Sequence, residues 1–266
     1  MLLVGNNEND IQLISINILN YCNINYINRI RTRKSMAEIQ TFTAKIMTRD
    51  YLTKDVMRVT FSVPQNFIFE AGQFVNVKCD NNGEIKWKAY SIVNPPSHKD
   101  MLELIIKIMP EGFASEVFKN SAPGQRFEIK GPFGSFSFDK ESSNTEHIFL
   151  GTGTGIAPFY SMIKEHLPKY QNKMFTLLFG VKTKEDLFLT TQFEILQKKF
   201  NNFSFNPVLS QDKWKGKTGH VQQHLPENLE NKTFYLCGIK KFVLETEALL
   251  LEKGVSKENI RKERYD

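Results

Sequence analysis

The chain has 266 residues, more than the roughly 100–200 of a typical single domain, so its length predicts two domains. Its 41% hydrophobic and 24% charged residues are typical of a folded globular protein and exclude a disordered chain, a collagen and a coiled coil. The 35 basic and 29 acidic residues give a net charge of +6, which suits an anionic cofactor or an acidic partner but is spread too evenly to indicate nucleic acid.

Three cysteines, Cys22, Cys79 and Cys237, lie far apart in the sequence. They are too few for a four-cysteine zinc or iron–sulfur site, and their odd number and wide spacing indicate no disulfide framework. We therefore expect no bound metal and no iron–sulfur domain on this chain.

Residues 1–35 differ from the rest of the chain, with eight Asn and seven Ile and no clean hydrophobic period. The segment could be an upstream extension before true initiation at Met36, or a disordered or weakly helical tail. Glu8 and Asp10 disfavour a basic targeting peptide, and the apolar runs are too short for a membrane span or a signal-peptide core. We leave the segment out of the fold and expect no transmembrane segment.

Residues 36–142 read as an all-β domain. Clusters of Gly, Pro, Asn and Asp separate β-branched and aromatic runs of a length typical of strands. The predicted strands are 39–46, 56–63, 73–78, 85–93, 102–108 and 126–130. Strands at this spacing predict a closed antiparallel β-barrel or a sandwich, interrupted by one helix at 113–119.

The hydrophobic period changes in residues 143–266, where strands alternate with helices. The predicted strands are 147–150, 174–180, 203–209 and 233–237, and the predicted helices are 157–170, 191–200, 220–225 and 240–253. This alternation predicts a Rossmann-like parallel sheet with helices on both faces. Ligands bind such a sheet beyond the carboxyl ends of its strands.

A glycine-rich segment, residues 151–158, links the first of these strands to the helix after it. Its glycines allow a tight turn and a close approach of backbone to a ligand, and the helix start offers amide donors suited to a pyrophosphate. The usual dinucleotide fingerprint would not continue with Ala157 and Pro158, and no acidic residue follows about twenty positions on. A plain strand–helix connection remains the alternative.

The predicted strand 85–93 carries a second candidate site. Lys88, Tyr90 and Ile92 share one face, so a cation and an aromatic ring could bind a phosphate and stack on a planar ring. Ser91 points the other way and could form a hydrogen bond at the strand's end. An ordinary amphipathic strand with a solvated lysine is the alternative.

The helix at 113–119 begins with Gly112, Phe113, Ala114 and Ser115. The position of Ser115 predicts an N-terminal cap. Its hydroxyl and the neighbouring amides could also hold a phosphate, and the two roles are compatible.

Taken in order, these motifs resemble those of the ferredoxin–NADP reductase superfamily. Residues 88–91 are similar to its Arg-x-Tyr-Ser strand, with Lys88 in place of the usual arginine. The other matching segments are 112–115, 131–136, 151–158, 179–187 and 235–238, and Glu263 falls where members have a C-terminal acidic residue. The resemblance covers residues 38–266.

The resemblance implies an FAD-binding barrel followed by an NAD(P)-binding α/β domain. It assigns catalysis to Ser91, Cys237 and Glu263, with Tyr90 stacked on the flavin and Cys237 lining the nicotinamide pocket. A buried thiol at a strand end is the alternative for Cys237. The cofactor-binding residues that it implies are Lys88, Ala89, Tyr90, Ser91, Gly112, Phe113, Ala114, Ser115, Gly153, Thr154, Gly155, Gly180, Ser210, Cys237 and Gly238.

Two departures from the family pattern carry information. Lys88 keeps the charge but lacks the bidentate geometry of arginine, so FAD could be held less tightly or FMN tolerated. Members that select NADPH commonly have arginines where this chain has Lys182 and Gln211, which favours NADH over NADPH. A row of lysines at 213, 215 and 217 could still hold a 2′-phosphate.

The implied activity is an FAD-dependent NAD(P)H oxidoreductase that passes electrons to a separate acceptor. Ferredoxin, flavodoxin, a cytochrome, an oxygenase component and free flavin are the candidate acceptors. A non-catalytic subunit that keeps the flavoprotein fold is the alternative. We expect a cytoplasmic monomer without nucleic acid, and Tyr265 either shields the flavin or belongs to a frayed terminus.

Overall fold

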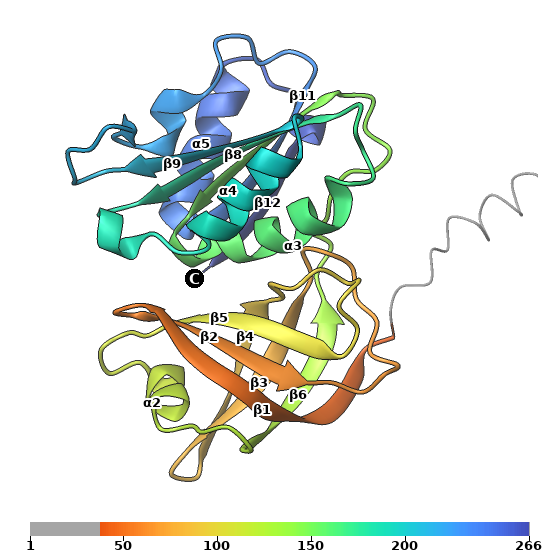
Figure 1. The fold of residues 1–266 in the computed structure, drawn as a ribbon, viewed down its shortest axis with the longest axis vertical. Helices are drawn as coiled ribbons and strands as arrows, with labels where there is room; N and C mark the ends of the chain where they lie inside the picture. The colour runs from red at the N-terminus through yellow and green to blue at the C-terminus, as the bar shows by residue number, and fades with distance from the viewer. Residues whose placement is uncertain (1–37, 266) are drawn as a thin grey trace, which may run out of the picture. The chain divides into compact units, whose positions relative to one another are not determined.

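The computed structural model describes residues 38–265, so the interpretations of residues 1–35 lie outside the described residues. From Ile39 onward the chain forms one compact unit. Its first half is an antiparallel sheet and its second half a parallel sheet with helices (Figure 1).

The antiparallel sheet contains the strands predicted for residues 36–142. In chain order they are β1 (Gln40–Thr53), β2 (Val56–Ser62), β3 (Phe74–Asn81), β4 (Glu84–Ser91), β5 (Met101–Lys107) and β6 (Arg126–Phe133). Their spatial order is β4-β3-β6-β1-β2-β5. A bridge between Ile92 and Leu104 joins the residue after β4 to β5, so the sheet curls until its two outermost strands meet. Of the predicted closed antiparallel barrel or sandwich, the antiparallel sheet is confirmed, and it curls into a half-barrel whose edges are joined by this bridge.

The interior of this barrel is aromatic and β-branched. Phe61 and Ile129 are fully buried, and Ile129 alternates along β6 with the more exposed Glu128 and Lys130. Helix α2 (Phe113–Lys119) lies between β5 and β6 in the chain and buries Phe118, whose ring stacks on Phe127 at 5.5 Å. This hydrophobic packing ties α2 to the barrel.

The parallel sheet consists of β7 (Glu146–Thr152), β8 (Met174–Val181), β9 (Phe203–Leu209), β10 (Lys217–Thr218), β11 (Lys232–Ile239) and β12 (Ile260–Tyr265). Their order is β10-β9-β8-β7-β11-β12. Helices α3 (Ala157–His166) and α4 (Thr190–Lys199) share a hydrophobic cluster on one face, and α5 (Lys240–Glu252) packs on the other (Figure 1). The predicted parallel sheet covered on both faces is therefore confirmed.

Several local predictions for this half need correction. The glycine-rich turn after β7 is a 3₁₀ helix, η1 (Gly153–Ile156), and the helix expected at 220–225 is the 3₁₀ helix η3 (Val221–His224). The sequence analysis also missed β12. Its Arg261, Lys262 and Arg264 are exposed because β12 is an edge strand, so the apolar run that marks a buried strand is absent.

The direction of strand addition reverses between β7 and β11. Strands β8, β9 and β10 follow β7 on one side of the sheet, whereas β11 and β12 lie on the other side. Gly151 at the end of β7 pairs with Cys237 near the end of β11. Ligands of open parallel sheets bind at such a switch point, beyond the carboxyl ends of the strands.

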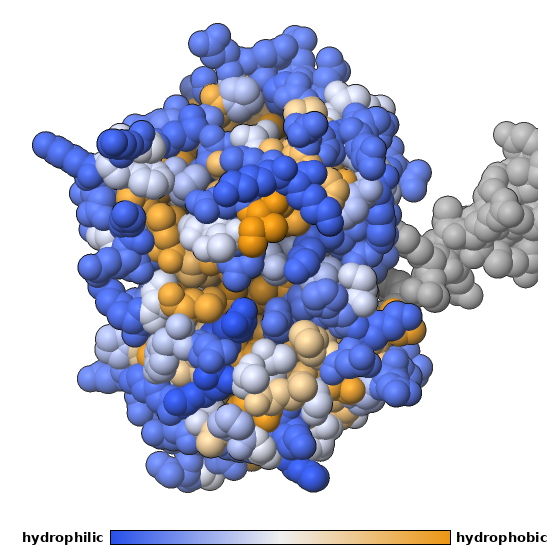
Figure 2. Space-filling view, in the orientation of Figure 1, coloured by the Kyte–Doolittle hydropathy of each residue, from blue (hydrophilic) through white to orange (hydrophobic). Residues whose placement is uncertain are grey.

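The surface of the described unit is mostly hydrophilic. Figure 2 shows charged and polar residues over most of the face in view, with smaller apolar patches among them. The longest helix within residues 38–265 is α5, with 13 residues, and none there is long and apolar enough to cross a bilayer.

Candidate functional site

Four side chains from three strands, β4, β11 and β12, meet at the switch point. The Ser91 hydroxyl donates a hydrogen bond to Glu263 Oε2 at 2.9 Å and lies 2.8 Å from the Tyr265 hydroxyl. The Tyr265 hydroxyl also forms a hydrogen bond with the Cys237 thiol. We call Ser91, Cys237, Glu263 and Tyr265 the carboxyl-edge cluster. It brings together the three residues to which the resemblance assigned catalysis.

The strand register explains how these side chains converge. Cys237 on β11 pairs with Glu263 on β12, and Tyr265 follows two positions later on the same face. Ser91 is the last residue of β4, so the barrel contributes one member and the parallel sheet three. Tyr265 is hydrogen-bonded within β12, which excludes the frayed-terminus alternative for this residue.

Burial shifts the protonation of the carboxyl-edge cluster. It raises the pKa of Glu263 to about 7, although the hydrogen bond from Ser91 opposes the shift. Burial also raises the pKa of the Cys237 thiol and of the Tyr265 phenol well above their ordinary values. Near neutral pH, Glu263 is therefore the member of this cluster that gains and loses a proton.

Two glycines let the backbone at the switch point close up. A Cβ on Gly155 would lie 2.3 Å from the Cys237 carbonyl oxygen, and one on Gly238 would lie 2.3 Å from Thr152 Oγ1. No side chain fits at either position, so the main chain of η1 rests directly on the end of β11. Thr152 Oγ1 is buried and has no hydrogen-bond partner within residues 38–265. An orphaned hydroxyl beside a glycine-lined cradle fits a ligand that carries polar groups.

Strand β4 offers an open surface next to the cluster. Lys88 and Ala89 are exposed, and Trp87 keeps 42% of its surface exposed although it is a large apolar residue. Tyr90 is half-buried and meets Phe118 of α2 edge to face, with ring centroids 5.7 Å apart. A cation, an aromatic ring and free surface on one strand fit a planar anionic cofactor such as FAD.

The start of α2 differs from the sequence prediction. Gly112 is the N-cap residue, and Ser115 lies within the first turn, where its hydroxyl accepts a hydrogen bond from the Met109 amide at 2.9 Å. The expectation that Ser115 caps the helix is therefore wrong. A Cβ on Gly112 would lie 2.6 Å from Ser115 Oγ, so a side chain at this position would displace the Ser115 hydroxyl.

The far end of α2 is held by a residue that sequence reasoning missed. Arg49 Nη1 donates to the carbonyl oxygens of Phe118, Lys119 and Ser121 at 2.9, 2.6 and 2.7 Å. The last carbonyls of a helix have no partner in a following turn, and a cation there also suits the helix dipole. The Phe118 carbonyl accepts a further hydrogen bond from the Ser121 hydroxyl at 2.8 Å. No local signal in the sequence links Arg49 to a helix about 70 residues away.

The remaining predicted residues lie at the ends of β8 and β9. Gly180 packs closely on Val221, and the Ser210 hydroxyl donates to the Val181 carbonyl at 3.4 Å. The amide of Lys184 donates to Asp212 Oδ2 at 2.7 Å, so the loops after the two strands are joined. Sequence analysis overlooked Asp212, which places a carboxylate beside the position where NADPH-selective members have arginine.

Comparisons with known proteins agree with this architecture. Residues 43–138 match the family model of the oxidoreductase FAD-binding domain, and residues 149–247 match that of the oxidoreductase NAD-binding domain. Ferredoxin–NADP reductase B of Sorangium cellulosum is 29% identical over 246 residues, covering 87% of this chain and 100% of that protein.

Two further relatives are reductases with other partners. The reductase component of phenol 2-monooxygenase from Pseudomonas sp. (strain CF600) is 30% identical over 206 residues, 74% of this chain and 58% of that protein. The crystal structure of the Amycolatopsis cytochrome P450 reductase GcoB aligns with a TM-score of 0.81 at 25% identity and covers 86% of this chain and 71% of that one. The chain thus spans the whole of the first relative but little more than half of the phenol 2-monooxygenase component.

The two family models and these relatives agree with the two-part fold. The chain therefore belongs to the ferredoxin–NADP reductase superfamily and is an NAD(P)H-dependent flavoprotein oxidoreductase with FAD as its cofactor.

Proposed function

We propose that this flavoprotein takes electrons from NADH and delivers them to a separate redox protein, with the carboxyl-edge cluster as its hydride-transfer site. One observation carries the proposal: the Ser91 hydroxyl, at the end of the cofactor-binding strand β4, is hydrogen-bonded to Glu263 at the end of the nucleotide-binding sheet. A site assembled from both halves of the chain is what transfer between two cofactors requires.

The residues present fit both cofactors. Lys88, Tyr90 and the backbone of 112–115 would hold FAD, while the η1 backbone, Cys237 and Gly238 would hold the nicotinamide nucleotide. When bound, FAD accepts a hydride from the nicotinamide and can release the electrons one at a time.

The chain's own residues position the reacting groups. Glu263 and Tyr265 fix the Ser91 hydroxyl, so the hydroxyl keeps one orientation at the end of β4. Glu263 can hold or release a proton at Oε2 near neutral pH. Gly155 and Gly238 keep side chains out of the space beside Cys237, and the Tyr265 hydroxyl lies 2.8 Å from the Ser91 hydroxyl.

The preference for NADH rests on the loops after β8 and β9. Lys182 and Gln211 stand where NADPH-selective members have arginines, and the Asp212 carboxylate next to them repels a 2′-phosphate. The lysines at 213, 215 and 217 are exposed and oppose this effect, so the preference is a matter of degree.

The acceptor is proposed to be a small acidic redox protein or an oxygenase component. The positive net charge of +6 favours an acidic partner. Relatives that are reductases of this kind include the phenol 2-monooxygenase component. The family's reductase activity leaves the non-catalytic alternative without support.

Anaerobic mixing of the FAD-loaded protein with NADH or NADPH tests the proposal. We expect the visible flavin absorbance to bleach about tenfold or more faster with NADH, because one charged contact to the 2′-phosphate is missing. Ferredoxin, flavodoxin, cytochrome, an oxygenase and free flavin are then compared as acceptors. Protein that cannot be loaded with flavin, or that neither nucleotide reduces, contradicts the proposed function.

Cys237→Ala tests the place of the nicotinamide. Reduction should slow by about tenfold, because the ring loses a packing surface, while FAD is retained. Cys79→Ala is the matched control, since Cys79 is equally buried but lies in the barrel core. Equal reduction rates in the two variants would remove Cys237 from the site.

A further inference from the structure

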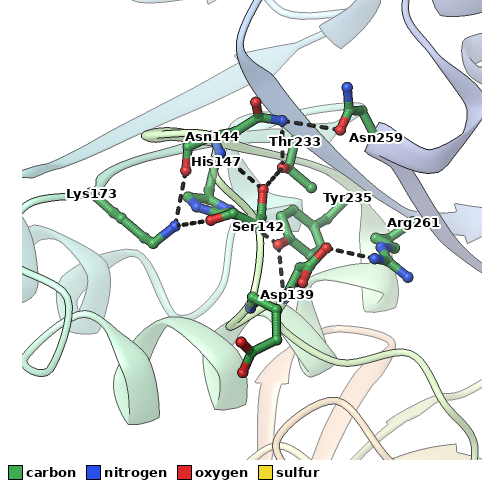
Figure 3. Close-up of polar contacts among 10 residues, drawn as sticks. Asp139, Ser142, Asn144, His147, Lys173, Thr233, Tyr235, Asn259 and Arg261 are labelled. Atoms are coloured by element: carbon green, nitrogen blue, oxygen red, sulfur yellow. Dashed lines mark hydrogen bonds and ion pairs between the residues drawn. The ribbon is translucent and has the colours of Figure 1, made fainter. Parts of the chain in front are cut away.

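The segment between the barrel and the parallel sheet is held by a polar network (Figure 3). This connection runs from the end of β6 at Phe133 to the start of β7 at Glu146. The ammonium of Lys173, which is only 7% exposed, donates to the carbonyl oxygens of Ser142 and Asn144 at 2.8 and 2.9 Å. Two backbone carbonyls of the connection are thus fixed by one buried cation.

Side chains of the connection bind the starts of neighbouring strands. The Asn144 amide donates to Thr233 Oγ1 at 3.1 Å and to Asn259 Oδ1 at 3.0 Å. The Ser142 hydroxyl lies 3.0 Å from the same Thr233 hydroxyl. The connection is therefore attached to β11 and to the turn before β12, as well as to its own neighbours in sequence.

Asp139 contacts both β11 and β12. Its amide donates to the Tyr235 hydroxyl at 3.1 Å, and its carboxylate accepts a hydrogen bond from Arg261 Nη2 at 2.5 Å. The preceding residue, Phe138, is buried and stacks on the Tyr235 ring with an interplanar angle of 12°. Phe138 and Asp139 thus contact β11 and β12 at two residues, Tyr235 and Arg261, that are paired across the sheet.

The strand register relates the Tyr235–Arg261 pair to the proposed reaction site. Tyr235 pairs with Arg261, and two positions further along the strands Cys237 pairs with Glu263. Residues two apart on a strand share a face and lie roughly 7 Å apart. Asp139 therefore binds the strand pair directly upstream of Cys237 and Glu263, and Glu263 is the residue of that pair that binds Ser91.

We propose that Asp139 is a positioning residue, which sets β11 and β12 relative to the barrel so that Ser91 stays in hydrogen-bond contact with Glu263. This inference rests on the proposed function, since it takes the carboxyl-edge cluster as the hydride-transfer site. The Asp139–Arg261 pair is suited to such a role. Arg261 is 47% exposed, so the pair adds little to folding stability, yet it links the barrel exit to an edge strand that has one neighbouring strand.

The first test measures flavin reduction in the FAD-loaded full chain at saturating NADH. Asp139→Asn and Arg261→Gln should each slow reduction by about three- to tenfold, because small displacements of the reacting groups are costly. The double variant should be no slower than either single variant, since both remove one interaction. Asp139→Arg combined with Arg261→Asp should recover part of the rate.

The matched control is Asp55→Asn. Asp55 Oδ2 pairs with Lys107 at 2.5 Å, the same distance, but both residues belong to the barrel. Its reduction rate and FAD affinity should equal those of the wild type. Asp139→Asn should also keep its FAD affinity, because the barrel residues proposed to hold FAD are unchanged.

A second readout does not depend on activity. The rate at which a thiol reagent alkylates Cys237, resolved by peptide mass spectrometry, should rise several-fold in Asp139→Asn as the end of β11 loosens. Alkylation of Cys79, equally buried in the barrel, is the internal reference and should not change.

The outcomes separate the inference from the proposed function. Faster Cys237 alkylation in Asp139→Asn supports the positioning role even where the wild type is not reduced by either nucleotide, a result that overturns the proposed function alone. If Asp139→Asn has the same rate of Cys237 alkylation and the same rate of flavin reduction as the wild type, the positioning role is overturned. A fall in reduction rate that merely follows loss of FAD overturns it as well.

Discussion

The two ends of the parallel sheet differ in how their polar groups titrate. At the amino edge, where β7 and β11 begin, burial lowers the pKa of His147 to about 4, so this histidine is neutral at physiological pH. At the carboxyl edge, burial raises the pKa of Glu263 to about 7, so this carboxyl exchanges its proton near neutrality. Desolvation disfavours the charged form of a group, so it lowers the pKa of a base and raises the pKa of an acid. It therefore keeps the histidine neutral at one end of the sheet and brings the titration of the carboxyl close to neutral pH at the other.

The two ends also differ in the partners of a buried threonine hydroxyl, although His147 Nε2 at the amino edge is itself buried without a partner among the described residues. At the amino edge, Thr233 Oγ1 contacts both Ser142 and Asn144. At the carboxyl edge, the buried Thr152 Oγ1 has no partner among the described residues. A hydroxyl with two partners fixes its surroundings, whereas a buried hydroxyl without a partner fits a polar group of a ligand. The contrast between the two threonines agrees with an amino edge that holds the connection in place and a carboxyl edge proposed to receive a ligand.

The largest expected effect comes from filling the carboxyl edge. Gly155→Val would place a Cβ within 2.7 Å of three backbone atoms of Cys237 and Gly238, none of which can rotate away. We expect a loss of about 3 kcal/mol in unfolding free energy and no measurable reduction by NADH. Chemical denaturation and anaerobic mixing measure the two effects.

Gly153→Ala is the control for this substitution. Gly153 lies two positions earlier in η1, and a Cβ there would meet nothing within 4 Å, although its φ of +53° disfavours a side chain. The cost should be about 1 kcal/mol. Equal losses in both variants would show that backbone conformation, and not the close approach to β11, makes glycine necessary.

The sequence predicted those parts of the fold and site that have local causes. Glycine spacing and the change of hydrophobic period were enough to expect β7, the turn after it and α3 in the right order. They also brought Ser91, Cys237 and Glu263 into one hypothesis through the family resemblance.

Contacts between residues far apart in the sequence could not be predicted from local sequence patterns. Arg49 binds α2 across 69 or more residues and Arg261 binds Asp139 across 122, and neither pair leaves a pattern in its own segment. Strand β12 was missed for a related reason, because an edge strand rich in charged residues resembles a polar tail.

The next expected effect is a loss of folding stability in acid. For His166, burial lowers the pKa to about 4 against an ordinary value of 6.5, so the unfolded chain binds more protons between these values. Stability should therefore fall as the pH drops from about 6.5 towards 4, by roughly 3 kcal/mol for this residue. His166→Phe should flatten the fall, since its ring already stacks on Phe138 and its Nδ1 has no partner among residues 38–265.

Thermal unfolding across this pH range measures the effect. The exposed His98 provides the control, because His98→Gln should leave the acid dependence unchanged. If the stability of His166→Phe falls with pH as steeply as that of the wild type, protonation of another group causes the loss. His147 is then the next residue to change.

Glu263 should produce the opposite pH dependence. Its pKa is about 7 in the folded chain against an ordinary 4.5, so the folded state binds more protons and stability falls as the pH rises from 4.5 through 7. Glu263→Gln should be about 2 kcal/mol more stable than the wild type at pH 8, and this gain should vanish below about pH 4.5. It should also remove the change in flavin-reduction rate that we expect of the wild type near pH 7. A pH profile that keeps this step in Glu263→Gln would assign the proton to another group.

The smallest effect compares one substitution at both edges. Thr233→Val removes a hydroxyl with two partners and leaves the Ser142 hydroxyl and the Asn144 amide short of one, so unfolding free energy should fall by about 1–2 kcal/mol. Thr152→Val removes a hydroxyl that is buried without a partner, and its effect should lie between zero and a gain of about 1 kcal/mol. The volumes are nearly equal in both exchanges, so the sign of the difference reports hydrogen bonding and not packing. If Thr152→Val destabilises as much as Thr233→Val in the cofactor-free protein, the Thr152 hydroxyl is already satisfied, for instance by water. The two edges would then differ only in the opposite directions of the pKa shifts of His147 and Glu263.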